Sequence, residues 1–159
     1  WDQRPFEIRT LFNPAFTGLI LFRVMQGHEE EDPRGIPFSL TLLTLPLCLY
    51  KDSREVFAAG SRSRLLKIME KNPQVQVNFS DRVTTMLPYA LESFGLLMES
   101  GCISTSDDGR FQTVSDKVRK SITGTSETKS CQRVARFLGK EFARIADRVT
   151  IYTTFGVRP

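Results

Sequence analysis

The residues that could carry acid–base, nucleophilic or metal chemistry are few and far apart in this sequence. The chain contains one histidine, His28, and three cysteines, Cys48, Cys102 and Cys131. A Ser-His-Asp or Cys-His site would have to use His28, which lies beside an acidic run and which we interpret as a solvent-facing loop residue. One histidine and three isolated thiols also make a metal site with nitrogen and sulfur ligands hard to build. The sequence therefore favours a protein that is not itself an enzyme, with no catalytic residues, metal or cofactor.

The acidic run at positions 29–32 could attract a hard cation. It lacks the alternating oxygen ligands of a calcium loop, so we interpret it as part of a flexible, solvated loop over 28–36 that also contains Pro33 and Gly35. The sequence has no Walker-type glycine loop and no Gly-x-Gly-x-x-Gly after a strand. These observations leave no motif for nucleotide chemistry.

A cationic ladder is the most informative chemical pattern in the chain. It consists of Lys129, Arg133, Arg136, Lys140 and Arg144, which fall within about 80° of one another on a helix predicted over 126–146. Apolar residues occupy the opposite side of this helix. The ladder can be a solvated face, or it can bind an anionic partner, either a nucleic-acid backbone or an acidic protein surface.

Composition indicates an ordinary globular protein. The chain has 159 residues, 40% of them hydrophobic and 25% charged, with a net charge of +4, so we expect a single domain over 1–159 with mild basicity. The longest apolar run, 36–50, contains two prolines and is shorter than the roughly 20 residues of a membrane span, so we expect a buried helix and no membrane partner. The odd, scattered cysteines favour a reducing, cytoplasmic compartment.

Sequence periodicity and capping signals predict a chain that is helical first and mixed later. Asn13 and Pro14 start a helix that we expect to end at Gly27. The further predicted elements are a helix over 38–50 kinked at Pro46, short helices over 53–58 and from Ser61 or Ser63 to 71, a short strand over 75–79, a helix over 82–99 and a β-hairpin over 101–114.

This order predicts a mostly helical α+β fold with a winged-helix-like core and the 101–114 hairpin as its wing. The helix before the hairpin would be the recognition helix of a DNA-binding protein. Its polar positions include Asp81, Glu92 and Glu99 but only one arginine, Arg82, and phosphates would be repelled by that balance. We therefore interpret the wing as architecture or as a protein contact.

The C-terminal segment 148–159 is rich in β-branched and aromatic residues and alternates in polarity, which predicts a final strand. Such a strand can pair within the domain or add to the sheet edge of a partner. We accordingly predict that Tyr152, Phe155, Val157 and Arg158 contact a partner protein.

Several short motifs together resemble a known family. They are Asn13-Pro14-Ala15-Phe16, Leu45-Pro46-Leu47 followed by Ser53-Arg54-Glu55, Phe137-Leu138-Gly139-Lys140, Thr150-Ile151-Tyr152 and Phe155-Gly156-Val157-Arg158-Pro159. In this order they resemble the middle component of bacterial three-component ABC ATPase systems, a group that includes the small accessory subunit of Lamassu-type anti-phage defence. The resemblance covers nearly the whole chain. Lys140 departs from the family pattern, because a bulky aromatic residue is expected to follow Phe137-Leu138-Gly139 closely. Phe142 can serve as that aromatic residue.

The resemblance implies a non-catalytic adaptor subunit in an anti-phage or anti-plasmid defence complex. Such a subunit joins an SMC-like coiled-coil ABC ATPase to an effector, often a nuclease, and double-stranded DNA would be a further partner of the complex through the basic helix. The family supplies no catalytic residues to carry over. The alternative from the element order is a winged-helix DNA-binding transcriptional regulator.

Overall fold

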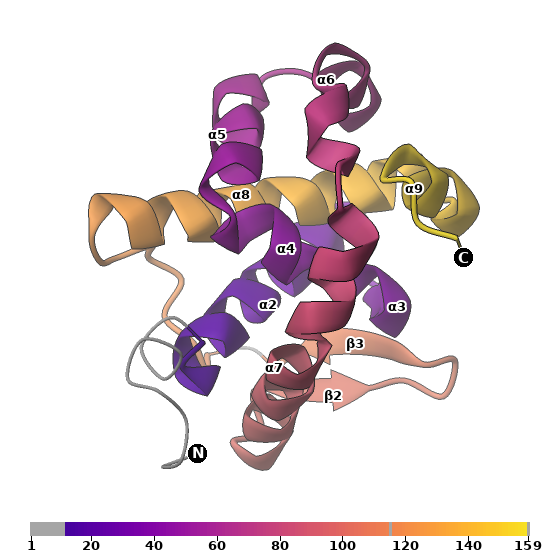
Figure 1. Ribbon diagram of the computed structural model, residues 1–159. Helices are drawn as coiled ribbons and strands as arrows, with labels where there is room; N and C mark the ends of the chain where they lie inside the picture. Colours follow the sequence, from indigo (N-terminus) through magenta and orange to yellow (C-terminus); the bar gives the residue numbers. More distant parts are fainter. Residues whose placement is uncertain (1–11, 115, 159) are drawn as a thin grey trace.

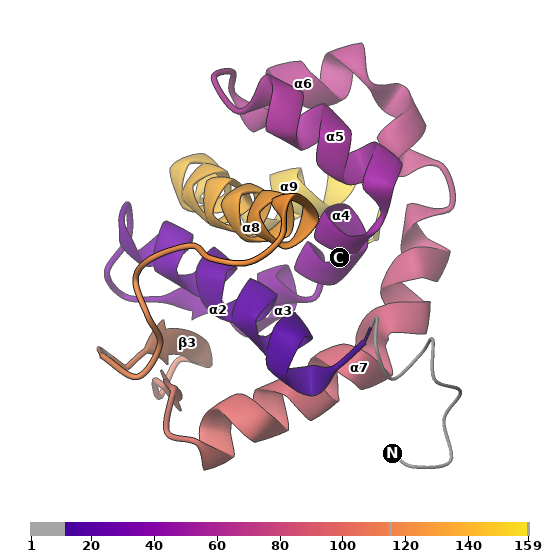
Figure 2. The same cartoon turned by 90° about the vertical axis from the view of Figure 1, so that its left-hand side faces the viewer.

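Two long helices, α2 (Pro14–Glu29) and α8 (Ser126–Ile145), cross at the centre of the molecule and organise the fold (Figure 1). The computed structural model describes residues 12–114 and 116–158. These form a mostly helical α+β fold with one small antiparallel sheet, which confirms the predicted fold class. In Figure 2, α8 is seen nearly end-on between α2 on one side and α5 and α6 on the other.

Helix α2 begins as predicted and ends later than predicted. The Asn13 side chain accepts a hydrogen bond from the Ala15 amide at 2.9 Å, and Pro14 occupies the first turn. Gly27, expected to end the helix, lies inside it, because the helix continues through His28 to Glu29. Gly27 is needed for packing instead of capping.

Two glycines permit the close crossing of α2 and α8. A Cβ built on Gly27 would overlap the carbonyl oxygen of Arg136, and one built on Gly139 would overlap the carbonyl oxygen of Val24 and the amide of His28. Both obstructing groups belong to the backbone of the other helix, so a side chain at either position would force the helices apart.

The segment predicted as one kinked helix is two helices, α3 (Phe38–Thr41) and α4 (Thr44–Leu49). The break falls four residues before Pro46, where a proline ring would clash with a helical carbonyl. Two further helices follow, α5 (Lys51–Gly60) and α6 (Leu65–Lys71), and neither has a side-chain cap, so the expected serine caps are wrong.

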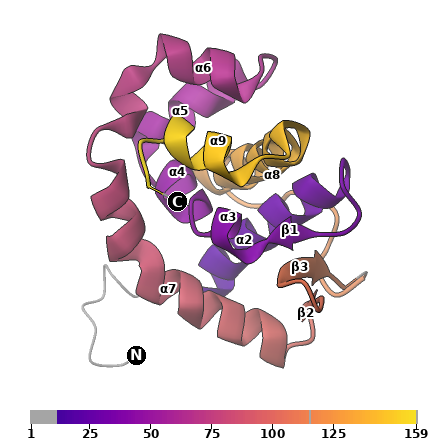
Figure 3. The same ribbon diagram turned by 90° about the vertical axis from the view of Figure 1, so that its right-hand side faces the viewer.

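Residues 73–79 do not form the predicted strand. The 3₁₀ helix η1 (Pro73–Gln76) takes its place and leads into α7 (Phe79–Glu99), which starts earlier than expected and contains Pro88. Figure 3 shows α7 curving along one side of the molecule from the level of α6 to the sheet. The buried side of α7, which includes Phe94, packs against α2 and α4.

The predicted hairpin is present as β2 (Ile103–Thr105) and β3 (Arg110–Thr113). A two-residue strand that the sequence did not reveal, β1 (Ile36–Pro37), pairs with the other side of β3, so the sheet order is β1-β3-β2. The sheet joins the core through Phe111, whose ring centroid lies 5.3 Å from Phe38 and 5.0 Å from Phe94. The winged-helix interpretation of this arrangement stays a prediction.

The predicted C-terminal strand is wrong, because Arg148–Thr154 form the helix α9. Asp147 caps this helix by accepting a hydrogen bond from the Thr150 amide at 2.9 Å. Ile151 and Phe155, four residues apart, are both fully buried. The cap and this helical spacing override the β propensity of the segment.

None of the helices in the described ranges combines the length and apolar character that crossing a bilayer requires.

The glycine crossing predicts opposite effects for the same substitution at two helical positions. Gly139→Ala should lower the free energy of unfolding by about 1 to 3 kcal/mol, because the new methyl group overlaps backbone of α2. Gly95→Ala, in α7, should raise it by about 0.5 to 1 kcal/mol, because a Cβ there meets open space and glycine is a poor helix former. Urea unfolding followed by circular dichroism measures both, and an unchanged stability of the Gly139 variant would contradict the packing.

Candidate functional site

The predicted basic helix exists as α8 and presents the cationic ladder on the side away from the core. Thr125 caps the helix through a hydrogen bond from the Thr128 amide, and the apolar side carries the buried residues Val134, Leu138 and Phe142. The ladder residues Arg133, Arg136 and Arg144 are exposed, and Lys129 and Lys140 are half-buried. Sequence periodicity therefore placed this face correctly.

Three of the five ladder cations are neutralised within the chain. Arg136 Nε and Lys140 Nζ each lie 2.5 Å from a carboxylate oxygen of Glu30. Arg144 Nη2 lies 2.7 Å from Glu31, and its Nη1 lies 2.9 Å from Glu141. The C-terminal half of the ladder therefore has its counter-charges within the chain.

The acidic run is correspondingly an anchored turn and not a free loop. Glu30 and Glu31 bind α8, and Glu29 accepts hydrogen bonds from the amide and hydroxyl of Thr113 at 2.5 Å each. Burial opposes ionisation of Glu30, but the hydrogen bonds from Lys140 and Arg136 outweigh it and lower the pKa of this carboxyl below its ordinary value. The sequence signal that could have revealed this pairing is the match between an acidic run and a basic face.

The N-terminal end of the ladder keeps its charge. Neither Lys129 nor Arg133 forms an ion pair with any residue in the described ranges. Two arginines of the turn between α5 and α6, Arg62 and Arg64, line the same groove as Arg133. Sequence analysis missed both, because only the tertiary fold brings this turn over α8.

Three of the four C-terminal residues predicted to contact a partner, Tyr152, Phe155 and Val157, pack against the core of the chain. Phe155 is fully buried, with its ring centroid 5.2 Å from Phe79 and 6.4 Å from both Phe57 and Phe142. The Tyr152 hydroxyl donates a hydrogen bond to the Ser39 carbonyl at 2.8 Å. Val157 is half-buried and Arg158 is exposed. Phe155 has no surface to offer a partner, so its predicted role is corrected to a core residue.

His28 is buried in α2, with 3% of its surface exposed, and is not the loop residue that the sequence suggested. It lines a cleft of about 750 Å³ between the hairpin turn and the α8–α9 junction, and its Nδ1 atom is buried with no hydrogen-bond partner among the described residues. Burial lowers the pKa of His28 from 6.5 to about 4, against an opposing effect of the Asp32 carboxylate. The imidazole is therefore neutral at pH 7.

The three carboxylates of this cleft are already engaged. Asp32 pairs with Arg34 at 2.8 Å and with Arg110 at 3.5 Å, and the hydrogen bond from Arg34 lowers its pKa to about 2. Asp108 pairs with Arg110 at 2.9 Å, and Asp147 caps α9. Carboxylates held ionised in this way are not poised to exchange protons near pH 7.

Two of the three cysteines, Cys48 and Cys131, are buried. Burial raises the pKa of the thiols of Cys48 and Cys131. Within the described ranges, no group of three or more metal-ligating side chains comes together.

Comparison with known proteins identifies the family. The family model described as "ABC-three component (ABC-3C) system Middle Component 3" matches residues 1–159, so the chain belongs to this family. The chain is accordingly an accessory component of a three-component ABC system. No curated protein and no solved structure matches it.

The burial of His28 predicts how stability depends on pH. Its pKa is about 4 in the folded chain against an ordinary value of 6.5, so the unfolded chain takes up the proton first as the pH falls. Between these two values the free energy of unfolding should fall with decreasing pH, by on the order of 3 kcal/mol in total. Equilibrium unfolding in urea at stepped pH values measures this slope, and His28→Gln should remove it.

The protonation of His28 can also be measured directly in the wild-type chain. Because His28 is the only histidine, a single histidine Hε1 resonance is expected in the NMR spectrum, and it should not titrate until the pH approaches 4. A midpoint near 6.5 in the folded protein would contradict the burial of this side chain.

Proposed function

We propose that this member of the middle component 3 family is a non-catalytic adaptor that joins an SMC-like, coiled-coil ABC ATPase to an effector, often a nuclease, in an anti-phage or anti-plasmid defence complex. The observation that carries the proposal is the family match along the whole sequence given, residues 1–159. A middle component of a multi-component system has protein partners. In the proposed adaptor role these partners are the ATPase and the effector.

The distribution of reactive and apolar groups supports a protein that works through its surface. His28 and the three carboxylates of the cleft beside it are buried or paired, as described above. By contrast, Leu87, Leu91 and Met98 are exposed by 36%, 50% and 44%, and they lie within about 40° of one another along α7. Clustered exposed apolar side chains are typical of protein-interaction surfaces.

Recognition of DNA through α7, as in the alternative of a winged-helix regulator, receives less support. Arg82, the one arginine of this helix, donates hydrogen bonds to the Val75 carbonyl at 2.6 Å and to the Ser53 hydroxyl at 3.0 Å. Its guanidinium also lies 4.8 Å from the centre of the Tyr50 ring. This arginine is occupied within the chain and is therefore not free to bind a phosphate.

The adaptor role predicts that the ATPase retains the effector only when this chain is present. All three components would be co-expressed with an affinity tag on the ATPase, and in parallel the ATPase and effector would be expressed without this chain. The complete set should elute as one stoichiometric complex by native mass spectrometry, and the incomplete set should lose the effector.

Two results would overturn the adaptor proposal. One is full retention of the effector by the ATPase in the absence of this chain. The other is a chain that stays monomeric in the presence of both components at micromolar concentration.

A further inference from the structure

We propose that the groove between the α5–α6 turn and α8 binds a short acidic segment of a partner protein that carries an apolar side chain between its carboxylates. This inference deepens the proposed adaptor function, on which the identity of the partner rests, by giving the chemistry of one contact.

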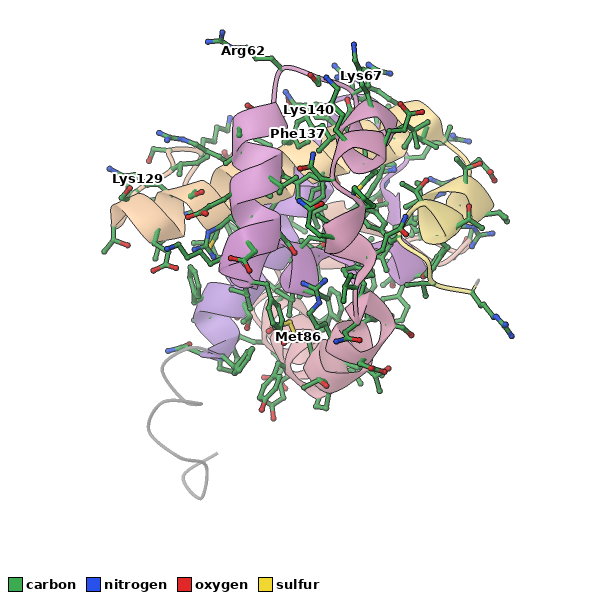
Figure 4. The ribbon with its side chains drawn as sticks, turned by 45° about the horizontal axis from the view of Figure 1, so that its top comes forward. Arg62, Lys67, Met86, Lys129, Phe137 and Lys140 are labelled. Atoms are coloured by element: carbon green, nitrogen blue, oxygen red, sulfur yellow. The ribbon has the colours of Figure 1, made fainter. Side chains whose placement is uncertain are left out.

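The groove is built from two elements that are distant in sequence. It has a volume of about 650 Å³ and is lined by Arg62 and Arg64 from the turn and by Arg133, Arg136, Lys140 and Arg144 from α8, together with Ile122 and Phe137. Figure 4 shows Phe137 and Lys140 beneath the turn from which Arg62 extends. Cations thus surround an apolar patch.

The charge of the groove is only partly balanced within the chain. Its six cations face three carboxylates, Glu141 in its wall and Glu30 and Glu31 at its edge, which leaves an excess of three positive charges. Glu141 is 1% exposed and is held by the Leu65 amide at 2.8 Å, so it is fixed in place. Arg62 and Arg133 form no ion pair with a described residue and are the cations open to a ligand.

The structure itself contains an example of how this face binds carboxylates. Glu30 and Glu31 reach Arg136, Lys140 and Arg144 at 2.5 to 2.7 Å from a turn of the same chain. A second acidic segment that binds at the end of the groove away from Glu30 and Glu31 would place its carboxylates on Arg62 and Arg133 by the same charge-assisted contacts. An apolar side chain between those carboxylates would cover Phe137.

A nucleic-acid backbone fits this groove less well. It carries one negative charge per phosphate, and those phosphates would approach Glu30 and Glu31 at the edge of the groove. A segment with two or three carboxylates matches the excess charge without this repulsion. The observations therefore favour an acidic protein segment.

The test uses the peptide Gly-Glu-Leu-Glu-Gly, amidated at its C-terminus and labelled with a fluorophore, and measures its anisotropy against the full chain in low salt. The double variant Arg62→Glu/Arg133→Glu reverses the excess charge and should weaken binding at least tenfold. Lys117→Glu is the matched control, because Lys117 is exposed, lies outside the groove and has no ion pair with a described residue. This control should bind the peptide like the wild type.

A change in the probe tests the apolar part without altering the protein. Replacing the leucine of the peptide by serine should weaken binding severalfold, because Phe137 then loses its apolar contact. Equal binding of the two peptides, an equal loss in the Lys117 variant, or no binding of either peptide would overturn the proposal. Tighter binding of a 20-base-pair DNA duplex that the double variant abolishes would also overturn it, in favour of a nucleic-acid site.

The outcomes separate this proposal from the adaptor function. Peptide binding with no retention of the effector by the ATPase would leave the groove standing and remove the adaptor role. Retention of the effector with no peptide binding would leave the adaptor role standing and remove the proposed groove contact.

Discussion

The close crossing of α2 and α8 is the constraint on which the rest of the structure depends. Gly27 and Gly139 let the two helix backbones approach until there is no room for a side chain at either position. Both helices then bury residues with no exposed surface, among them Ile20, Met25, Ala135 and Leu138, against the same core. Because the obstruction would come from backbone atoms, neither helix can relax by changing a rotamer, and the crossing has one geometry.

That geometry also decides the electrostatics of the surface. The crossing places the end of α2 beside the C-terminal half of the cationic ladder, so that Glu30 and Glu31 lie within ion-pair distance of Arg136, Lys140 and Arg144. The first turns of α8 lie beyond the reach of this turn and keep Lys129 and Arg133 uncompensated. The cationic ladder is thereby divided into a neutralised half and a charged half. Each of these ion pairs is partly exposed and contributes little to stability, so their main effect is on the charge that a partner meets.

Local sequence patterns correctly predicted the elements that depend on interactions between neighbouring residues. The cap at Asn13, the Asp108-Gly109 turn of the hairpin and the periodicity of α8 all predicted what the structure contains. The same reasoning failed where a distant contact decides. The C-terminal segment is strand-like in composition, yet it is helical and its Phe155 enters an aromatic cluster with the distant residues Phe57, Phe79 and Phe142.

The candidate site shows the same division between local and distant information. The ladder could be read from residues 129–144 alone. Its counter-charges, the arginines of the α5–α6 turn and the burial of His28 could not, because each depends on residues more than sixty positions away. A single sequence contains both the acidic and the basic residues of these ion pairs, but it does not show which of them come together in the fold.

Glu29, Glu30 and Glu31 are consecutive residues that hold different parts of the molecule, since Glu29 binds Thr113 in β3 while its two neighbours bind α8. A displacement of the hairpin therefore pulls on the same short stretch of backbone that positions the counter-ions of the helix. The three carboxylates therefore connect the sheet and the charged surface through one short stretch of backbone at the end of α2.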